Sequence, residues 1–574
     1  MKLLFKYLGA MRWYIALTLT VKIAASLIEL AIPYVLGHIL DNVVLEKSVA
    51  RIVFWGVVMV VCSLLACLGN IGANRMAAKV ARNTTKKIRH ELFESTMRLS
   101  SRQIDEFTIP SLESRLTSDT YHVHHLMGMS MRMGVRAPML LIGGIIITMT
   151  IDPVLSLLMM VTMPLIAITV ICISKKGIPL FKKNQGSVDG MIRVVREDAQ
   201  GIRVIKALSK VDFERRRYDK ANKQLVSDEK KAGTTMALSN PLVTFLLNLG
   251  LVSVIVVGAF RVNGDLSQTG KIVAFIQYFT MISNAMIMLS RIFVHSSKGM
   301  ASAHRIEEVI NTKPDLEVVD EGVYPSCEDS VEVRFDDVCF SYLGKKDNLS
   351  HVSFVIEKGQ SLGIIGATGC GKTTVIQMLM RLYDVDSGCV RIRGRDVRTI
   401  PHEELNTMFG VVMQNDFIYA GSIRDNLDFG RGIDDDELLK ACEIAQASEF
   451  ISGFEDGLDH HINSKGTNLS GGQRQRLLIA RAIAGRPDIL VLDDSSSALD
   501  YKTDSNLRRA IRENMADVTT VIVAQRVSSI MHCDRIIVLD DGVMIANGTH
   551  EELIESCAVY KEISESQIGG AFLD

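Results

Sequence analysis

Six long apolar segments constrain this chain more than any other feature of its sequence. Each is apolar over roughly 20 residues, the length that a helix needs to cross the hydrocarbon core of a bilayer. They lie near Tyr14–Leu36, Ile52–Ile71, Met127–Ile151, Val154–Ser174, Leu242–Phe260 and Ile272–Phe293. A buried soluble core is the alternative, but six such runs within the first half of the chain favour a membrane domain of six transmembrane helices.

The composition agrees with a membrane domain that is followed by a more polar one. The chain has 574 residues, of which 48% are hydrophobic, and a mean hydropathy of +0.21, which is high for a soluble enzyme. The formal net charge is -1, so no basic excess indicates nucleic acid as a partner. The ten cysteines are scattered and none is paired at metal-ligand spacing, which favours reduced thiols over a disulfide framework.

Lysine and arginine are unevenly distributed among the loops that join the six segments. Nine lie between the second and third segments, from Arg75 to Arg115, and sixteen between the fourth and fifth, from Lys175 to Lys231. Because basic loops stay on the cytoplasmic side, both long loops and both termini are predicted to be cytoplasmic, with the chain in the cytoplasmic (inner or plasma) membrane. Apolar residues at helical spacing within the long loops predict that the helices continue well beyond the bilayer.

Four charged residues lie within or close to the apolar segments. Lys22 and Glu29 are seven residues apart in the first segment, and Arg132 and Arg136 are four apart at the start of the third. Ionisable groups in a membrane domain face a partner or a water-filled cavity rather than lipid. A substrate cavity with a polar and cationic lining is one interpretation. Pairing within the chain, or extension of the arginines to the interface, is the other.

The sixth segment is rich in methionine and aromatic residues. It contains Met281, Met286 and Met288 together with Phe275, Tyr278 and Phe279. Flexible thioethers and aromatic rings suit a promiscuous apolar binding site, and ordinary packing is the alternative.

The pattern of the sequence changes after the sixth segment, and this change sets the predicted domains. Residues 1–295 are predicted to form the membrane domain, 296–330 a linker, and 331–574 a domain of short strands and helices. The linker is expected to begin as a helix through Ile310 and to become irregular at Pro314 and Pro325.

Residues 366–373, Gly-Ala-Thr-Gly-Cys-Gly-Lys-Thr, match the phosphate-binding pattern G-x-x-x-x-G-K-[ST]. An apolar strand ending at Ile365 precedes them and a helix beginning near Thr374 follows, which is the setting that the motif requires. The glycines let the backbone approach phosphates, and backbone N–H groups at the helix N-terminus face the negative charge. Lys372 is predicted to reach the β- and γ-phosphates, and the Thr373 hydroxyl to bind Mg²⁺.

Four further positions fit a nucleotide site. Tyr342 could stack on adenine, and Gln414, at the end of an apolar strand, could reach Mg²⁺ or the attacking water. Asp493, at the tip of the strand Ile489–Leu492, is predicted to hold Mg²⁺ through water. Leu469–Gln473, Leu-Ser-Gly-Gly-Gln, precedes a helix whose N-terminal N–H groups are free to bind an anion.

In this order the motifs resemble the cassette of ABC transporters. The series runs from Tyr342 through the phosphate loop, Gln414, LSGGQ, ILVLDD and SALD to Gln525. The membrane half resembles the exporter branch of that family, in the segment PYVLG with Asp41, in SRLTSD (114–119), in GIRVIKAL (201–208) and in ASAHRI (301–306). The resemblance covers nearly the whole chain.

The resemblance implies an all-α membrane domain of six helices with long cytoplasmic extensions, followed by an α/β P-loop NTPase cassette. It also implies a dimer in which ATP and Mg²⁺ lie between the phosphate loop of one cassette and LSGGQ of the other, with SRLTSD and GIRVIKAL at or near the coupling helices. The implied nucleotide-binding residues are Tyr342, Gly366, Thr368, Gly369, Cys370, Gly371, Lys372, Thr373, Thr374, Gln414, Ser470, Gly471, Gly472, Gln473 and Asp500, with Thr373, Gln414 and Asp493 at the metal.

The chain departs from the family pattern at the two positions that serve hydrolysis. Asp494 stands where the family places a glutamate, and Gln525 stands at the switch position where the family has a histidine. Asn463–Gly466 also replaces the usual Gly-Glu-Arg-Gly-like sequence before LSGGQ. An aspartate carboxylate is one methylene shorter, and glutamine cannot become cationic as histidine can. The site of this chain is therefore expected to bind nucleotide but to hydrolyse it slowly or not at all.

These departures favour a heterodimer whose second half-transporter carries the glutamate and the histidine. A homodimer with slow turnover at two identical sites is the alternative. The expected function is ATP-driven export of amphipathic or hydrophobic small molecules of the multidrug type. A homodimeric lipid or peptide exporter, an ATP-gated regulatory or sensor protein, and an importer on the same frame are the competing interpretations.

Overall fold

The computed structural model describes residues 6–320, 322–324, 331–342, 344, 346–495 and 497–569. The predicted irregular position Pro325 lies outside these residues. The chain divides into two compact units, Met1–Met97 with Pro110–Thr312, and Arg98–Ile109 with Lys313–Asp574. The short stretch Arg98–Ile109 interrupts the first unit in the sequence but packs in the second.

The first unit is helical, and six of its helical segments are long and apolar enough to cross a membrane, as predicted. After the short turn η1 (Gly9–Met11), its elements are α2 (Arg12–His38), η2 (Ile39–Val43), α3 (Val49–Met97), α5 (Ile109–Ser114), η3 (Arg115–Asp119), α6 (Thr120–Ile151), α7 (Pro153–Ala207), α8 (Val211–Ala237), α9 (Ser239–Asn263) and α10 (Thr269–Asn311). Helix α7 has 55 residues, which at 1.5 Å per residue is about 80 Å. The predicted helical continuation of the apolar segments is therefore confirmed.

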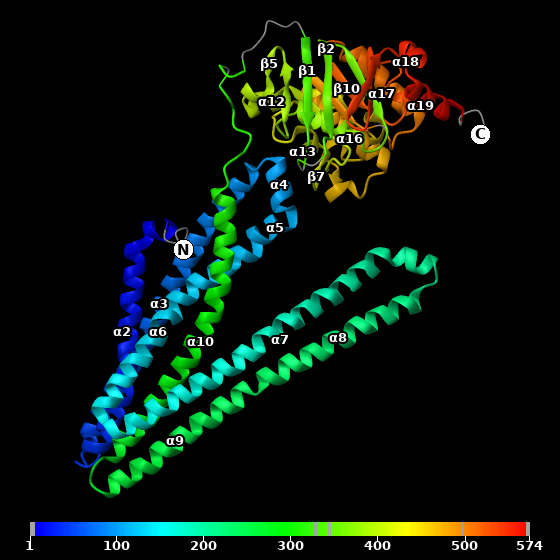
Figure 1. Cartoon of the computed structure of the whole chain (residues 1–574). Coiled ribbons are helices and arrows are strands. Elements are labelled where there is room, and N and C mark those ends of the chain that lie inside the picture. Colours follow the sequence, from blue (N-terminus) through cyan, green and yellow to red (C-terminus); the bar gives the residue numbers. More distant parts are fainter. Residues whose placement is uncertain are drawn as a thin grey trace. The chain divides into compact units, whose positions relative to one another are not determined.

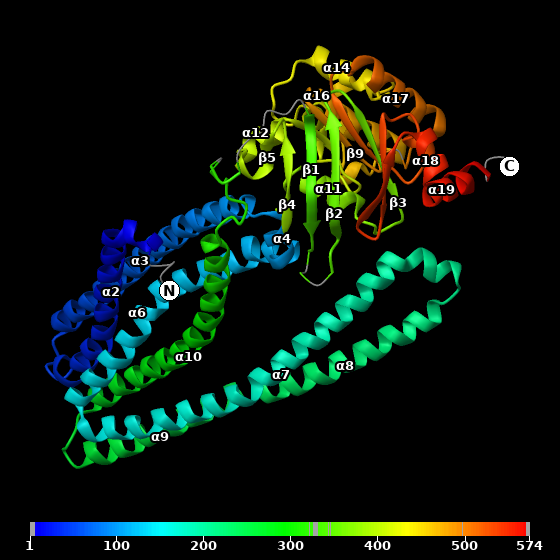
Figure 2. The ribbon, with the colours of Figure 1, turned by 45° about the horizontal axis from the view of Figure 1, so that its top comes forward.

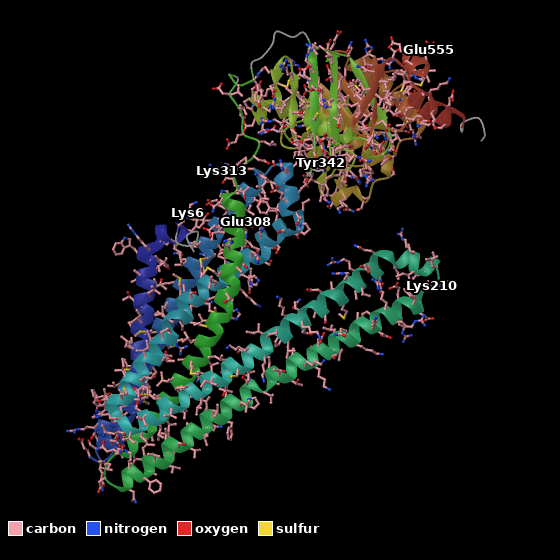
Figure 3. All side chains as sticks on the ribbon, in the orientation of Figure 1. Lys6, Lys210, Glu308, Lys313, Tyr342 and Glu555 are labelled. Atoms are coloured by element: carbon pink, nitrogen blue, oxygen red, sulfur yellow. The ribbon has the colours of Figure 1, made fainter. Side chains whose placement is uncertain are left out.

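Helices α2, α3, α6 and α10 pack together, whereas α7 runs antiparallel to α8 and α9 (Figure 1). The turn between α7 and α8, where Lys210 is labelled in Figure 3, closes this long hairpin. The apolar side chains around the turn are exposed, with fractions between 45% and 63%: Ile202, Val204, Leu208, Val211 and Phe213. GIRVIKAL therefore lies in the last turns of α7, beside an apolar tip.

The aromatic residues of the sixth segment belong to the apolar core of this unit. Phe275, Tyr278 and Phe279 are each at most 1% exposed and pack with Leu30. The Tyr278 hydroxyl donates a hydrogen bond to the Leu30 carbonyl at 2.5 Å. Met281 packs against the same cluster. For these residues packing, rather than a promiscuous binding site, is the correct interpretation.

Three of the four charged residues in the apolar segments have partners within the chain. The Arg136 guanidinium pairs with the Glu29 carboxylate, with Nε to Oε2 at 3.1 Å, which joins α6 to α2. The buried Lys22 ammonium donates to two asparagine amides of α3, at 2.7 and 3.1 Å. Arg132 donates from Nε to the Gly128 carbonyl of its own helix. Pairing within the chain is thus the arrangement of Lys22, Glu29 and Arg136.

SRLTSD packs against α10 within the first unit. Asp119 is 1% exposed and accepts hydrogen bonds from Ser302 Oγ and Arg305 Nε, each at 2.8 Å. Arg115 pairs with Glu308 at 2.9 Å. The segment therefore ties η3 to α10, and it is the preceding stretch Arg98–Ile109 that packs with the nucleotide-binding unit. Helix α10 continues to Asn311, which confirms the helical start of the predicted linker.

The second unit is an α/β domain built on two main sheets (Figure 2). A four-stranded antiparallel sheet has the order β2-β1-β4-β5, from β1 (Val331–Phe340), β2 (Leu349–Glu357), β4 (Ser387–Ile392) and β5 (Arg395–Asp396). A six-stranded sheet has the order β12-β11-β3-β10-β9-β6, from β3 (Ser361–Gly366), β6 (Phe409–Val412), β9 (Ile489–Asp493), β10 (Thr519–Val523), β11 (Arg535–Asp540) and β12 (Val543–Gly548). A two-stranded ribbon pairs β7 (Gly421–Ser422) with β8 (His461–Ile462).

In the six-stranded sheet the five strands from β11 to β6 are parallel to one another, and β12 is antiparallel to β11. Strand β9 is buried along its whole length, as expected for a parallel strand that is covered on both faces. The helices of this unit are α4 (Ser101–Phe107), α11 (Lys372–Leu379), α12 (His402–Thr407), α13 (Ile423–Asp428), α14 (Asp435–Ile444), α15 (Ser448–Ile451), α16 (Gly471–Ala484), α17 (Tyr501–Asn514), α18 (His550–Ser556) and α19 (Ala558–Gly569), with short turns η4 (Val397–Thr399), η5 (Gly457–Asp459), η6 (Ser464–Gly466) and η7 (Val527–Ser529).

Candidate nucleotide-binding site

The predicted site residues meet at one edge of the six-stranded sheet. Strands β6, β9, β10 and β3 are adjacent and parallel, so their carboxyl ends lie at the same edge. The phosphate loop follows β3, Gln414 follows β6, Asp493 ends β9 and Gln525 follows β10. Open parallel sheets bind ligands at this edge.

The phosphate loop has the conformation that its glycines were predicted to allow. Gly369 and Gly371 have φ values of +84° and +103°, in the left-handed region that other residues rarely adopt. A Cβ at Gly371 would lie 2.7 Å from the Asn348 carbonyl oxygen. The Lys372 ammonium donates to the carbonyl oxygens of Gly366 and Ala367, each at 2.9 Å, and so lies over the loop.

The loop opens onto a cleft of about 280 Å³. Ten predicted site residues line it: Thr368, Gly369, Gly371, Lys372, Thr373, Thr374, Gln414, Asp493, Asp494 and Gln525. Asn348 and Val523 complete the described lining. Asn348 belongs to no motif, so the sequence held no signal for it. The structure thus brings together residues that are far apart in the sequence, since Asn348 and Gln525 are separated by 177 positions.

Thr373 and Asp493 are in direct contact at the floor of the cleft. The Thr373 hydroxyl donates to Asp493 Oδ2 at 3.0 Å. Asp493 is 1% exposed, and this burial raises the pKa of its carboxyl above the usual value, against the hydrogen bond from Thr373. A hydroxyl and a carboxylate in this position are the hard oxygen ligands that Mg²⁺ prefers.

Asp494 and Gln525 are hydrogen-bonded to each other. Gln525 Nε2 donates to Asp494 Oδ2 at 2.9 Å. Burial raises the pKa of the Asp494 carboxyl, while Lys372 and the Gln525 amide act in the opposite direction. Asp494 has φ +49°, a left-handed conformation that aspartate adopts more readily than most residues.

A residue outside the motifs holds the backbone around Gln525. Gln567 of α19 donates from Nε2 to the Gln525 carbonyl at 2.8 Å and accepts from the Val527 N–H at 2.8 Å. This paired contact fixes the segment that presents the Gln525 side chain. A lone glutamine near the chain end gives no sequence signal for such a contact.

Tyr342 lies beside the cleft rather than in its lining. Its hydroxyl contacts Thr374 Oγ1 at 3.3 Å and the Gln377 side chain. Its ring packs edge-to-face with Phe340 and Tyr383, with centroids 4.8 and 5.2 Å apart. The tyrosine therefore adjoins the phosphate-binding helix at Thr374, within an aromatic cluster.

The signature residues lie elsewhere on this unit. Ser470 caps α16, with its hydroxyl accepting from Gln473 N–H at 3.2 Å and its own N–H donating to Gln473 Oε1 at 2.9 Å. None of the described residues that line the cleft comes from 470–473. Asp500 caps α17, because its Oδ1 accepts a hydrogen bond from the Thr503 N–H at 2.9 Å. Within one chain the phosphate loop and the exposed signature thus form separate sites.

Helix α4 connects the aromatic cluster to the polypeptide between α3 and α5. Tyr383 donates from its hydroxyl to Asp105 Oδ2 at 2.7 Å, and Gln103 Nε2 donates to the Lys313 carbonyl at 2.7 Å. Sequence analysis missed this docking, although a signal exists. Ser100 and Gln103 form a capping box, the S-x-x-Q pattern that begins a helix.

The residues at the sheet edge fit a nucleoside triphosphate with Mg²⁺. The left-handed glycines leave space at Gly369, where an added Cβ would meet nothing within 4 Å. The loop N–H groups and Lys372 supply positive charge for phosphates, and Thr373, Gln414 and Asp493 supply oxygen ligands.

Comparisons with known proteins agree with this architecture. The family profile described as the ABC transporter transmembrane region matches residues 15–286, and the profile described as ABC transporter matches residues 349–497. An uncharacterized ABC transporter ATP-binding protein of Mycobacterium tuberculosis is 33% identical over 98% of each chain. The uncharacterized ABC transporter ATP-binding protein YfiB of Bacillus subtilis is 33% identical over 94% of each chain. The structure of a bacterial Atm1-family ABC exporter with ATP bound covers 97% of this chain and 98% of its own, with a TM-score of 0.78 and 22% identity.

Proposed function

Because the chain belongs to the ABC transporter family, as a six-helix membrane domain fused to an ABC ATPase, we propose that it is one half of a heterodimeric exporter. The exported compounds are amphipathic or hydrophobic small molecules. The chain lies in the cytoplasmic membrane with both termini and the cassette in the cytoplasm, an orientation supported by the lysine and arginine bias of its long loops. The exporter-like fold supports the direction of transport.

The hydrogen bond between Gln525 and Asp494 carries the heterodimer proposal. A water-polarising base must hold a carboxylate oxygen free and close to the attacking water. The Asp494 side chain is one methylene shorter than glutamate, and one of its oxygens accepts from the Gln525 amide. A misplacement of about 1 Å can lower a rate by roughly 10²-fold. The site of this chain therefore binds nucleotide and hydrolyses it slowly or not at all.

The remaining residues of the cleft keep their binding roles in this proposal. Lys372 and the loop N–H groups neutralise and orient the β- and γ-phosphates. Thr373, Gln414 and Asp493, which line the cleft, would hold Mg²⁺, the last of them through water. Bound at these residues, Mg²⁺ would supply positive charge that stabilises the negative charge on the phosphates.

The intact signature supports a second, hydrolytic site that is shared with the partner. Ser470, Gly471 and Gly472 lie at the exposed N-terminus of α16, where free N–H groups attract a phosphate. These residues would complete the phosphate loop of a second half-transporter that supplies the glutamate and the histidine. One chain thus gives its binding cleft to one site and its signature to the other.

The test begins with the complex purified by a tag on this chain from its own host membrane. Native mass analysis is expected to show one copy of this chain with one copy of a different six-span ATPase. A complex of two identical chains contradicts the heterodimer. ATP hydrolysis by this chain alone in lipid at about ten per second or faster, within the usual enzyme range, contradicts the impaired site. Ligand-linked gating without substrate accumulation in vesicles would instead indicate a sensor or channel regulator.

A further inference from the structure

Helix α19 contacts the segment that presents Gln525 to the nucleotide cleft. Gln567 Nε2 donates to the Gln525 carbonyl, and Gln567 Oε1 accepts from the Val527 N–H, each at 2.8 Å. These two backbone groups flank Arg526, so one side chain spans the segment. A primary amide carries a donor nitrogen and an acceptor oxygen in one plane, which lets a single glutamine make both hydrogen bonds. Gln567 therefore holds the segment at two points.

The segment lies beyond the part of the backbone that the sheet supports. Strand β10 ends at Val523, and the Ala524 N–H still donates to the Ile364 carbonyl of β3 at 3.1 Å. Gln525 and Arg526 then belong to no helix or strand. A backbone group outside regular structure needs another partner, and for the Gln525 carbonyl this partner is the Gln567 amide.

Helix α19 is itself anchored in the nucleotide-binding unit. Tyr560, Ser564 and Gln567 follow the i, i+4, i+7 spacing of one helical face. Tyr560 and Ser564 are each at most 1% exposed. The Tyr560 ring packs in an apolar cluster with Val527, and its hydroxyl lies 2.8 Å from His550 Nδ1. Gln567 thus continues the buried face of α19 toward the segment that it holds.

The side chain that this segment presents lies in the nucleotide cleft. Gln525 lines the cleft with Lys372 and Asp494, and its Nε2 donates to Asp494 Oδ2 at 2.9 Å. An amide N–H is also a donor for a phosphate oxygen. Asp494 and Gln525 stand at the two positions that serve hydrolysis of the terminal phosphate. Their side chains would therefore be reached by a triphosphate and not by a diphosphate.

We propose that Gln567 is a positioning residue through which α19 gives this cleft its preference for ATP over ADP. It places the Gln525 amide where that amide donates to the terminal phosphate. A hydrogen bond to a charged oxygen weakens steeply as its geometry worsens, so a small shift of the backbone at Gln525 weakens the binding of ATP alone. The inference rests on the proposed function, in which the cleft binds ATP without rapid hydrolysis. It deepens that function by assigning the discrimination to a helix outside the nucleotide motifs.

The test uses the full-length protein, in its purified assembly, in nanodiscs. The reporter is radiolabelled 8-azido-ADP, and after photolysis the label on this chain is measured separately by gel electrophoresis. Unlabelled ADP or the non-hydrolysable AMP-PNP competes with the reporter in the presence of Mg²⁺. The ratio of their two affinities gives the preference for the terminal phosphate. Because the reporter is a diphosphate, its own binding shows that the cleft of each variant is folded.

The variant Q567M keeps the length of the side chain and removes both of its hydrogen-bonding groups. E565M is the matched control, because Glu565 lies on the same turn of α19. Its side chain is 69% exposed and pairs with Lys561 of the same helix at 3.8 Å. Q525A and Q525A/Q567M complete a double-mutant cycle, which separates an effect through Gln525 from an independent one.

We expect Q567M to lower the affinity for AMP-PNP about fivefold, the equivalent of one ordinary hydrogen bond, and to leave the affinity for ADP unchanged. E565M should match the wild type. Q525A should lower the same ratio of affinities. Q525A/Q567M should lower it no further than Q525A, because Gln567 acts through Gln525.

An equal loss of affinity for AMP-PNP and ADP in Q567M would overturn the proposal, because it would show general damage to the cleft. An unchanged ratio in Q567M, or losses in Q525A and Q567M that add in the double variant, would overturn it too. If Q525A left the ratio unchanged, the contact of Gln525 with the terminal phosphate would fail together with the proposal. None of these readouts measures turnover or the identity of the second subunit, so the impaired-site and heterodimer proposals stand or fall by their own tests.

Discussion

At the scale of single residues, the proposed impairment of hydrolysis rests on two side chains, Asp494 and Gln525. Gln525 Nε2 donates to Asp494 Oδ2 at 2.9 Å, which joins the two side chains in one polar contact. Every nearby binding group is retained. In the proposed function, hydrolysis at this edge of the sheet therefore depends on these two side chains and not on the fold.

Restoring both side chains should restore hydrolysis. The variant D494E/Q525H extends the carboxylate and supplies an imidazole that can become cationic, and we expect ATP turnover by this site to rise roughly 10²-fold. Steady-state phosphate release measures it, with K372A as the inactive control and each single variant for comparison. An unchanged rate in the double variant would show that the impairment lies elsewhere.

Cys370 should react slowly with thiol reagents at neutral pH. It is 3% exposed, and burial raises the pKa of its thiol, so the reactive thiolate is scarcer than in a free cysteine. Modification should accelerate as pH rises toward that pKa and should abolish nucleotide binding at this site, because the added group fills the phosphate loop.

Peptide mass spectrometry after timed exposure to N-ethylmaleimide measures the modification of Cys370, with glutathione as the reference thiol. Mg-ATP should protect the cysteine. Rapid labelling at pH 7, or nucleotide binding that survives complete labelling, would contradict this account.

The residues of the site were predictable where a motif fixes both chemistry and backbone. Lys372, Thr373 and Asp493 follow strands of apolar residues, and the parallel sheet brings those strand ends together. Asn348 and Gln567 could not be predicted, because each acts through a contact distant in sequence that no local pattern encodes.

At the scale of elements, α4 is the part of the intervening polypeptide that belongs to the nucleotide-binding unit. Its capping box begins it after α3, and Asp105 accepts from the Tyr383 hydroxyl beside Tyr342. SRLTSD, which the resemblance placed at or near a coupling helix, begins at the end of α5, and its Asp119 accepts a hydrogen bond from Arg305 of α10. Both stretches are polar and charged, so their composition does not show which of them packs with the nucleotide-binding unit and which pairs with α10 in the membrane unit.

Removing the Tyr383 hydroxyl should loosen α4. The variant Y383F deletes one hydrogen bond to a carboxylate, a loss of about 1–2 kcal/mol. Hydrogen exchange in residues 98–109 should therefore become faster. Y419F is the matched control, because Tyr419 is 51% exposed and packs with other aromatics instead of α4. Equal exchange in Y383F and wild type would show that the contact does not hold α4.

The pair of Glu29 and Arg136 joins α2 to α6 and should respond asymmetrically to substitution. E29Q leaves a guanidinium without its carboxylate in the membrane unit, and we expect it to lower stability by about 2 kcal/mol. E29Q/R136Q removes both charges and should recover part of that loss. Thermal unfolding in nanodiscs measures both. If E29Q/R136Q were less stable than E29Q, the loss of this ion pair would not explain the lower stability of E29Q.

At the scale of the whole molecule, the proposed function assigns two half-sites to the chain, and none of the described residues that line the cleft comes from the signature. The cleft at the phosphate loop and the exposed N-terminus of α16 are each complete in their own residues. Six apolar helices and the order of the cassette motifs predicted this architecture correctly.

A substitution in the signature should disable the partner's site and spare this chain's own. In G471D the new Cβ has room, with Ala498 Cβ at 3.6 Å, and an acidic residue in the first turn favours the helix. Its carboxylate repels the phosphate that the partner presents, so hydrolysis by the pair should fall about 10²-fold. Photolabelling with an azido-ATP analogue should still mark this chain. Loss of labelling together with hydrolysis would contradict two separate half-sites.

The exposed apolar side chains at the turn between α7 and α8 should affect how much of the chain accumulates in the cell. Leu208, Phe213 and the other exposed apolar side chains at this turn form an apolar surface outside the six apolar segments. Chaperones and proteases recognise such tips on newly synthesised subunits. A chain made in excess over its partner should be degraded, so its abundance should follow the dosage of the partner's gene rather than its own.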